Sequence, residues 1–354
     1  MKNTTKYIIG VMSGTSLDGI DIAYIKIGYT NNYTFEILYS TTVSYSTQWK
    51  TILKEGFHLS GEALTKLDAD YGIHLGNIIL NFVTENKITN VDFIASHGHT
   101  IFHNPEKNYT LQIGNGPQIT AITAVKTICD FRVQDIALGG QGAPLVPIGD
   151  ELLFSEYDYC LNLGGFVNIS FNENGQRIAF DICPVNIVLN HYVSQLDVEY
   201  DDKGIIASTG NIDESLLNEL NVLPFYNDTK PKSLGYEFIV ETIFPMIDKY
   251  NLEIRDILRT FVEHVAVQIA KKIDSNSKKT VLVAGGGAYN TFLINRIQSY
   301  TKTQLIIPED TIINYKEALV FALLGFLKDE EQINCLKSVT GANKNHCSGI
   351  VFNP

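Results

Sequence analysis

The two halves of the sequence begin in the same way, with apolar stretches on either side of a turn that contains glycine. In the first half, "KYIIGVMSG" and "GIDIAYIKIG" flank a short polar loop, and "YTFEILYSTTVSYS" continues the pattern. In the second half, "YDYCLNLGGFVNISF" is followed by "RIAFDICP". Stretches rich in Ile, Val, Tyr and Phe that are bounded by glycine are typical of β-strands. The repetition indicates a duplicated α/β plan, with one sheet in each half.

The remaining segments are mainly helical by pattern. Residues 49–86 repeat apolar side chains every three or four positions, and residues 200–280 do the same, which favours helices. Residues 186–196 and 315–327 are also predicted helices, and Glu317 lies at the start of the last one. A chain of 354 residues exceeds the ~250–300 at which single cores stop growing, so we expect two domains.

The domain junction is expected in the loop-like stretch "RVQDIALGGQGAPLVPIGD", where Gly139, Gly140, Gly142, Pro144 and Pro147 lie close together. The prediction is an N-terminal lobe over residues 1–133 and a C-terminal lobe over 134–339. The tail 340–354 is a candidate to return to the first lobe.

Charge and cysteine content exclude several classes of protein. The net charge of −12 argues against a nucleic-acid partner, which needs basic patches. Five widely spaced cysteines without a Cys-x-x-Cys pair favour reduced thiols in a cytoplasmic protein over disulfides or a structural zinc site. The N-terminal apolar run is too short for a signal peptide, and no run approaches the ~18 residues of a membrane helix.

The loop "SGTSLDG" has two interpretations. As a hairpin, its Asp-Gly pair is ordinary turn chemistry. As an anion site, its backbone N–H groups and the hydroxyls of Ser13, Thr15 and Ser16 would hold a phosphate beside Gly14, with Asp18 reaching a metal through water. The loop lacks the lysine of a P-loop, and these residues alone do not decide between the two.

Two further segments are candidates for chemistry. Asp181 in "AFDICPVN" is expected at the carboxyl end of a strand, as a general base or as a turn or helix-cap residue, with Asn186 able to cap the next helix. "VAGGGAYN" is predicted to run from strand through a glycine turn to helix, which suits a nucleotide contact. It is an incomplete dinucleotide fingerprint, because Asn290 stands where the third glycine belongs.

Other polar residues have equally open interpretations. His97, His99 and His103 could bind a metal, but no carboxylate has diagnostic spacing, so contacts to a ligand are favoured over zinc. Arg132 could clamp an anion or form a surface salt bridge. Glu317 has the simple interpretation of a first-turn acid that faces the helix dipole.

Taken together, the sequence resembles the anhydro-N-acetylmuramic acid kinase family of the actin-like, hexokinase-like ATPase superfamily. The matching segments occur in family order over nearly the whole chain. They are "GVMSGTSLDGID", "SHGHT", "TLQIG", "DFRVQDIALGGQGAPLVP", "LNLGGFVNIS", "FDICPVN", "VAGGGAYN" and "EALVFALLG". The resemblance implies a two-lobed, ribonuclease-H-like α/β fold in which each lobe has a mixed five-stranded sheet with helices and the ligand cleft lies between the lobes.

The resemblance also implies an activity. It is the ATP- and Mg²⁺-dependent opening of 1,6-anhydro-N-acetylmuramic acid by water, with phosphorylation of the 6-oxygen, in murein recycling by a cytoplasmic homodimer. The matching positions imply Asp181 as the base that activates water and Asp18 as the metal contact through water. His97, Arg132 and Glu317 would bind the sugar. ATP and its phosphates would contact Gly10, Ser13, Gly14, Thr15, Ser16, Leu17, Asp18, Gly164, Gly165, Gly285, Gly286 and Gly287.

The sequence departs from the family pattern beside the expected base and in two loops. Ile182, Cys183 and Val185 replace small residues, and Val cannot easily adopt a positive φ. His99 stands where Gln is usual, and Asn115-Gly116 stands where Asp-Pro is usual. A non-catalytic member of the fold that senses ATP or the sugar is therefore the alternative hypothesis, and an NAD-dependent enzyme that uses "GGGAYN" is a third.

Overall fold

The computed structural model describes residues 3–14, 17–227, 233–273 and 279–354. The chain forms two compact units, of which the first comprises Met1–Leu153 and Tyr315–Pro354 and the second comprises Phe154–Asn314. Within the described ranges, none of the helices has the length and apolar character needed to cross a membrane.

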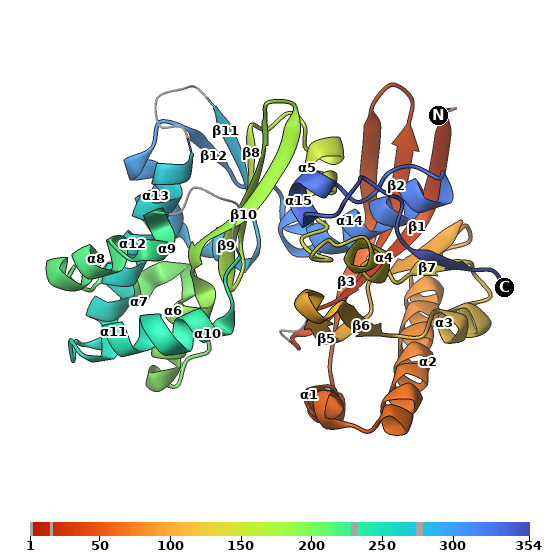
Figure 1. The fold of residues 1–354 in the computed structure, drawn as a ribbon, viewed down its shortest axis with the longest axis horizontal. Coiled ribbons are helices and arrows are strands. Elements are labelled where there is room, and N and C mark those ends of the chain that lie inside the picture. Colours follow the sequence, from red (N-terminus) through yellow and green to blue (C-terminus); the bar gives the residue numbers. More distant parts are fainter. Residues whose placement is uncertain (1–2, 15–16, 228–232, 274–278) are drawn as a thin grey trace. The chain divides into compact units, whose positions relative to one another are not determined.

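The first unit is built on a six-stranded mixed sheet with the order β13-β7-β4-β1-β2-β3 (Figure 1). The first three strands of the chain are antiparallel neighbours, whereas β4 is parallel to β1 and β7 is parallel to β4. The strands are β1 (Thr4–Ser13), β2 (Gly19–Tyr29), β3 (Tyr33–Ser44), β4 (Phe93–Ser96), β7 (Thr127–Cys129) and β13 (Ile350–Phe352).

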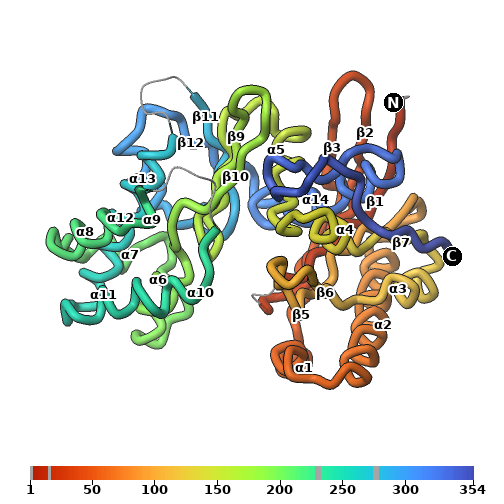
Figure 2. Tube along the Cα trace, in the orientation of Figure 1, coloured from red at the N-terminus to blue at the C-terminus, as the bar shows by residue number. Residues whose placement is uncertain are grey.

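The tube in Figure 2 shows the C-terminal strand β13, in blue, beside β7, and the two strands pair antiparallel. A separate hairpin joins β5 (His99–Asn104) to β6 (Tyr109–Ile113). The helices of this unit are α1 (Thr47–Glu55), α2 (Gly61–Glu85), α3 (Gly116–Thr123), α4 (Val133–Ala137), α5 (Pro147–Leu153), most of α14 (Asp310–Asp329) and α15 (Lys337–Thr340).

The second unit repeats the plan with the strand order β10-β9-β8-β11-β12. Its first three strands are antiparallel, and β11 is parallel to both β8 and β12. The strands are β8 (Tyr159–Leu163), β9 (Phe166–Glu173), β10 (Gln176–Pro184), β11 (Thr280–Ala284) and β12 (Gln304–Ile306). The helices are α6 (Asn186–Val193), α7 (Ile205–Ser208), α8 (Glu214–Asn221), α9 (Pro224–Asn227), α10 (Tyr236–Phe238), α11 (Phe244–Asp248), α12 (Ile254–Lys272) and α13 (Thr291–Tyr300).

Both sheets therefore contain three antiparallel strands followed by two parallel ones in the same order, which is the topology of the ribonuclease-H-like fold. The predicted fold class and the duplicated plan are confirmed. The first sheet has a sixth strand because β13 adds to the edge formed by β7. Each unit has its own apolar core, for example Ile9, Tyr71 and Leu75 in the first and Leu161, Phe261 and Val283 in the second.

The boundaries of the units differ from the predicted 1–133 and 134–339. The first unit extends to Leu153 and takes in the chain again from Tyr315. The stretch predicted to be loop contains two short helices, α4 and α5. Helix α14 begins at Asp310, so the prediction that Glu317 lies in the first turn is wrong by two turns.

Helix α14 belongs to the first unit because two glycines let it approach the sheet. A Cβ at Gly10 would lie 2.1 Å from the carbonyl oxygen of Ala318, and a Cβ at Gly325 would lie 2.8 Å from the Ala95 side chain. Gly10 is paired inside β1 with Ala23 and Ala95, so its lack of a side chain has a packing cause.

Gly10→Ala should therefore lower the free energy of unfolding by roughly 1–3 kcal/mol, because the added Cβ is fixed to the strand and meets a backbone carbonyl that cannot turn away. Urea denaturation measures the loss. Gly61→Ala is the matched control, because a Cβ at Gly61 meets nothing within 4 Å. Equal stability of the two variants would contradict the packing role of Gly10.

Candidate active site

Two glycine turns lie at one edge of the second sheet. Gly164 and Gly165 connect β8 to β9, and Gly285–Gly287 follow β11. Strands β8 and β11 are parallel neighbours, with Asn162 opposite Ala284. Both turns therefore leave the carboxyl edge of the sheet together, which is where open α/β sheets bind ligands.

The glycines of the second turn are required by close backbone approach. Gly285 has a φ of 81°, and a Cβ there would lie 2.4 Å from Oδ1 of Asn162. A Cβ at Gly287 would lie 2.7 Å from the Leu163 side chain. Gly286 differs, because it is exposed and a Cβ there would meet no atom of the described residues within 4 Å. This residue marks the open side of the turn.

Asn186 connects the first turn to the start of α6. Its Nδ2 donates to the carbonyl oxygen of Leu163 at 2.9 Å, while the backbone N–H of Val185 donates to Gly165 O at 2.8 Å. The expectation that Asn186 caps the helix is wrong, because the N-cap position is Val185 and Asn186 is the first helical residue. The side chain is used to hold the glycine turn instead.

Asp181 lies in β10, opposite Asn168 on β9, and a bulge follows it before Cys183. The strand continues to Pro184, so Asp181 is not at its end as predicted. The side chain is half-buried, and the backbone N–H of Leu234 donates to Oδ2 at 2.8 Å. Burial raises the pKa of this carboxyl above 3.8, and the Leu234 bond opposes that rise. A half-buried carboxylate with a raised pKa is a chemically reasonable base.

The residues beside Asp181 that depart from the family pattern have side chains packed in the apolar core of the second unit. Ile182, Cys183 and Val185 are all buried, and burial raises the pKa of the Cys183 thiol far above its ordinary value. Val185 has a φ of −138°, so this position does not use the positive φ that a glycine would permit. The departures leave Asp181 and the glycine turns in place.

The opening loop joins β1 to β2, as the strand–turn–strand pattern predicts. Ser13 is buried, and its hydroxyl donates to Gly98 O at 2.7 Å. Leu17 has a φ of 59° and is buried. Asp18 is exposed. Burial raises the pKa of Asp21 and its hydrogen bond from Thr42 lowers it, while the negative charge of Asp18 adds a smaller rise. Thr15 and Ser16 lie outside the described residues, and Gly14 is half-buried.

Arg132 and His97 form a bonded pair in the first unit. Arg132 Nε donates to His97 Nε2 at 2.9 Å, and Nη1 donates to Gly142 O at 2.6 Å. Burial and the Arg132 charge hold the pKa of His97 far below 6.5, so the ring is neutral. Its Nδ1 then carries the proton and donates to Gly98 O at 2.8 Å. The arginine is held by this network and not by a surface salt bridge.

Glu317 lies on α14 within the electrostatic range of Arg132. Burial lowers the pKa of Arg132 to about 10, and the charges of Glu317, Cys335 and Asp135 oppose the shift. Glu317 as a residue is exposed, but its carboxyl is surrounded by protein atoms, and this burial raises the pKa of the carboxyl while the charge of Arg132 lowers it. The pair offers a cation and an anion to a polar ligand.

The three histidines of the "SHGHTIFH" segment have separate surroundings. His97 bonds to Arg132, His103 Nδ1 lies 3.1 Å from Thr110 Oγ1, and His99 is buried beside the ring of Tyr71. Burial lowers the pKa of His99 to about 4. They do not gather as metal ligands, since in the described part of the chain the one cluster of three such groups lies elsewhere.

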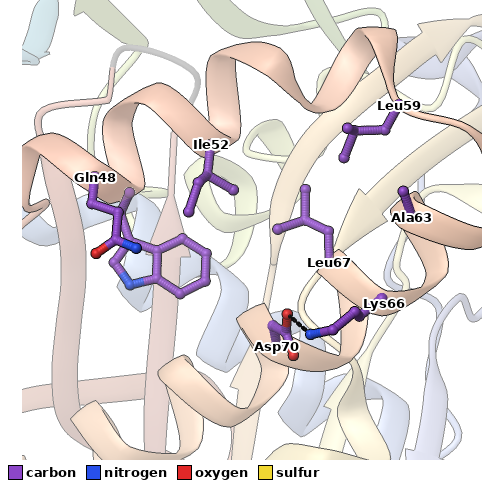
Figure 3. Close-up of a pocket in the computed structure, with 8 residues that line it drawn as sticks. Gln48, Ile52, Leu59, Ala63, Lys66, Leu67 and Asp70 are labelled. Atoms are coloured by element: carbon purple, nitrogen blue, oxygen red, sulfur yellow. Dashed lines mark hydrogen bonds and ion pairs between the residues drawn. The ribbon is translucent and has the colours of Figure 1, made fainter.

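A cavity of about 420 Å³ lies between α1 and α2 (Figure 3). It is lined by Trp49 and several aliphatic side chains, with an ion pair of Lys66 and Asp70 at 2.5 Å. None of the predicted site residues lines it. The candidate functional residues are therefore the bonded groups described above within each unit, and not the lining of this cavity.

Sequence reasoning missed Asp135 and Asn162. The Asp135 carboxylate accepts from Gly142 N at 2.7 Å and so supports the carbonyl that holds Arg132. The sequence feature that could have pointed to Asp135 is its position in the segment "DFRVQDIALGGQG", which also holds Arg132. Asn162, whose Oδ1 would collide with any Cβ at Gly285, was missed because it lies within a stretch that reads simply as a strand.

Comparison with known proteins decides the family. The model of the family described as anhydro-N-acetylmuramic acid kinase matches residues 6–354. The chain belongs to the anhydro-N-acetylmuramic acid kinase family. The kinase of that name from Crocosphaera subtropica is 34% identical over 98% of this chain and 99% of its own length. The one from Francisella tularensis subsp. novicida is 33% identical over 95% and 96%, respectively.

Solved structures resemble the chain more distantly. Component A of (R)-2-hydroxyglutaryl-CoA dehydratase from Acidaminococcus fermentans is 14% identical, with a TM-score of 0.45 over 90% of this chain and 96% of its own. A glucokinase of the ROK family from Streptomyces griseus is 10% identical, with a TM-score of 0.39 over 91% and 99%. Similarity at this level adds nothing to the family assignment.

Proposed function

We propose that this protein is an ATP-dependent kinase that opens 1,6-anhydro-N-acetylmuramic acid with water and phosphorylates its 6-oxygen. The product is N-acetylmuramic acid 6-phosphate, an intermediate of cell-wall recycling. The observation that carries the proposal is the family match over residues 6–354, in a chain that has Asp181 in the same sheet from which both glycine turns leave. That the protein resides in the cytoplasm and that it forms a homodimer both stay predictions from the sequence.

Asp181 is the proposed base. Its carboxylate takes a proton from the water that attacks C1 of the sugar, and the bond between C1 and the 6-oxygen breaks. The freed 6-oxygen attacks the γ-phosphorus of ATP, and the bond to the bridging oxygen breaks to leave ADP. The Leu234 N–H bond to Oδ2 fixes the orientation of the carboxylate and leaves Oδ1 for the water.

The glycine turns are the proposed nucleotide contacts. Gly285 and Gly287 let the backbone pack closely, and the exposed Gly286 offers the open surface. The opening loop is proposed to contact the phosphates through Gly14 to Asp18. Ser13 is proposed to anchor the start of that loop rather than to donate to a phosphate, since its hydroxyl proton is already bonded to Gly98 O. Gly10 lies inside β1, where its proposed contribution to the phosphate site is the packing of the strand that leads into the loop.

Mg²⁺ fits the opening loop. Asp18 is an exposed carboxylate, and it lies close enough to Asp21 for its charge to raise the pKa of Asp21. Mg²⁺ prefers oxygen ligands and usually keeps several of its bound waters. We propose that Asp18 holds the ion through water, where the ion would neutralise charge on the phosphates. Arg132 and Glu317 are proposed to bind polar groups of the sugar, with His97 orienting the guanidinium.

An ADP-release assay tests this function. ADP should form only when ATP, Mg²⁺ and the anhydro sugar are all present. Binding of MgATP and of the sugar without turnover would support the sensor hypothesis instead. A rise in melting temperature with NAD but not with MgATP would support an NAD-dependent enzyme and contradict the kinase.

Gly286→Val should raise the KM for ATP about tenfold or more, with little change in melting temperature. A Cβ at Gly286 meets no described atom within 4 Å and needs no change of φ, so we expect the larger side chain to obstruct a bound nucleotide more than the protein itself. Gly61→Val is the matched control, since a Cβ at Gly61, on α2, also meets no described atom within 4 Å. An unchanged KM for ATP in Gly286→Val would place the nucleotide elsewhere.

A further inference from the structure

A second cluster of potential ligands lies in the first unit, outside the proposed catalytic groups. Asp135, Cys335 and His346 are all buried, and one ligand atom from each lies within 4.8 Å of the other two. Carboxylate oxygen, thiolate sulfur and imidazole nitrogen together form a donor set that suits zinc.

The backbone places two of these side chains on one face. Cys335 and His346 are directly opposite residues of an isolated antiparallel bridge. They exchange both backbone hydrogen bonds, with Cys335 N to His346 O at 3.1 Å and His346 N to Cys335 O at 3.2 Å. Side chains of directly opposite residues lie on the same side of such a pair. The third group, Asp135, comes from α4.

The tautomer of His346 leaves a lone pair that faces the carboxylate. Nδ1 lies 3.2 Å from the carbonyl oxygen of Lys344, which can only accept, so Nδ1 carries a proton. In the neutral ring Nε2 is then an acceptor, and it lies 3.5 Å from Oδ1 of Asp135. Nε2 is buried and has no hydrogen-bond partner among the residues that the structure describes. Two acceptors that face each other require a cation or a proton between them.

The separation favours a metal over a proton. An N–H···O bond is ordinarily about 2.7–3.2 Å long, so 3.5 Å is long for an imidazolium that donates to a carboxylate. Two ligands about 2.0–2.2 Å from one tetrahedral zinc lie roughly 3.4 Å apart. A ligating histidine also typically donates its other ring N–H to a carbonyl, as His346 does.

The carboxylate is oriented independently of any metal. Thr340 Oγ1 donates to Asp135 Oδ1 and Gly142 N donates to Oδ2, both at 2.7 Å. Each oxygen keeps a further lone pair. A Cβ at Gly140 would lie 2.2 Å from Oδ2, so this glycine makes room for the carboxylate.

We propose that Asp135, Cys335 and His346 bind a zinc ion that fastens the C-terminal segment to the loop supporting Arg132. Binding releases the proton of the Cys335 thiol to solvent, and the ion takes its place between the three donors. Three protein ligands leave the fourth tetrahedral position of the zinc for a water molecule. The site is separate from the groups proposed for the kinase reaction.

Metal content of the full-length protein tests the site. Protein incubated with Zn²⁺ and desalted should retain about one equivalent by mass spectrometry, lost in Cys335→Ser and His346→Gln but kept in Cys129→Ser. Cys129 is the matched control because it is a half-buried thiol of the same unit outside the cluster. Co²⁺ should give a thiolate charge-transfer band in the wild type and in Cys129→Ser but not in Cys335→Ser.

Two outcomes would overturn the proposal. Wild-type protein that retains no Zn²⁺ and gives no cobalt band would show that a proton, not a metal, lies between Asp135 and His346. Metal retained equally in Cys335→Ser and His346→Gln would show that it binds elsewhere. Neither readout depends on the kinase activity, so the test is independent of the proposed function.

Discussion

Asp181→Asn should lower kcat by about 10²–10⁴-fold, which is the usual contribution of a positioned general base. The amide has the same shape, and its oxygen can still accept from Leu234 N, so the fold is expected to persist. It cannot take a proton from water. The measurement is ADP release at saturating ATP and sugar, with the melting temperature recorded for each variant.

Glu173→Gln is the matched control for Asp181→Asn. Glu173 is an exposed carboxylate on the same β9–β10 hairpin, opposite Gln176, and its loss should leave kcat unchanged. The wild-type kcat should also fall as the pH drops, because the base works only when ionised. Burial raises the pKa of Asp181, so the midpoint of this fall should lie above 3.8. Wild-type turnover by Asp181→Asn would remove Asp181 from the mechanism.

Arg132→Lys should lower kcat/KM for the sugar by about 10²-fold. A lysine keeps the charge but cannot donate to His97 Nε2 and Gly142 O in the geometry of the guanidinium. Buried hydrogen bonds from charged groups contribute about 1.5–3 kcal/mol each, so loss of one well-placed bond accounts for a change of this size. Steady-state kinetics with each substrate varied in turn measure the effect.

The comparison of the two substrates makes the Arg132 prediction specific. The KM for ATP should change little, because Arg132 is proposed to bind the sugar. Arg255→Lys, an exchange at an exposed arginine of α12, should change neither constant. A loss that falls on ATP alone would reassign Arg132 to the nucleotide.

Local patterns were enough to predict the repeated architecture. Strand signals on both sides of the opening loop and of Gly164-Gly165 match β1–β2 and β8–β9, because alternating and β-branched apolar residues determine strands locally. The strand–glycine turn–helix order around Gly285–Gly287 also agrees, with a 3₁₀ turn before α13. Short helices were missed in the segment that holds α4 and α5, where glycines and prolines suggested a loop.

Contacts between segments far apart in the chain could not be predicted from a single sequence. The bond between Arg132 and His97, the approach of Ala318 to Gly10 and the contact of His346 with Asp135 each join residues far apart in the chain. Each depends on how sheets and helices pack. The same limit explains why Asn186 was expected to cap a helix, since its true partner, Leu163 O, lies on another strand.

Mass spectrometry of the sugar product tests the central claim most directly. After incubation with ATP and Mg²⁺, the anhydro sugar should gain one water and one phosphoryl group together, with one ADP formed for each product molecule. Release of ADP and free phosphate with an unchanged sugar would contradict this account. So would a sugar that gains a phosphoryl group without water, because Asp181 is proposed to activate the water that opens the ring.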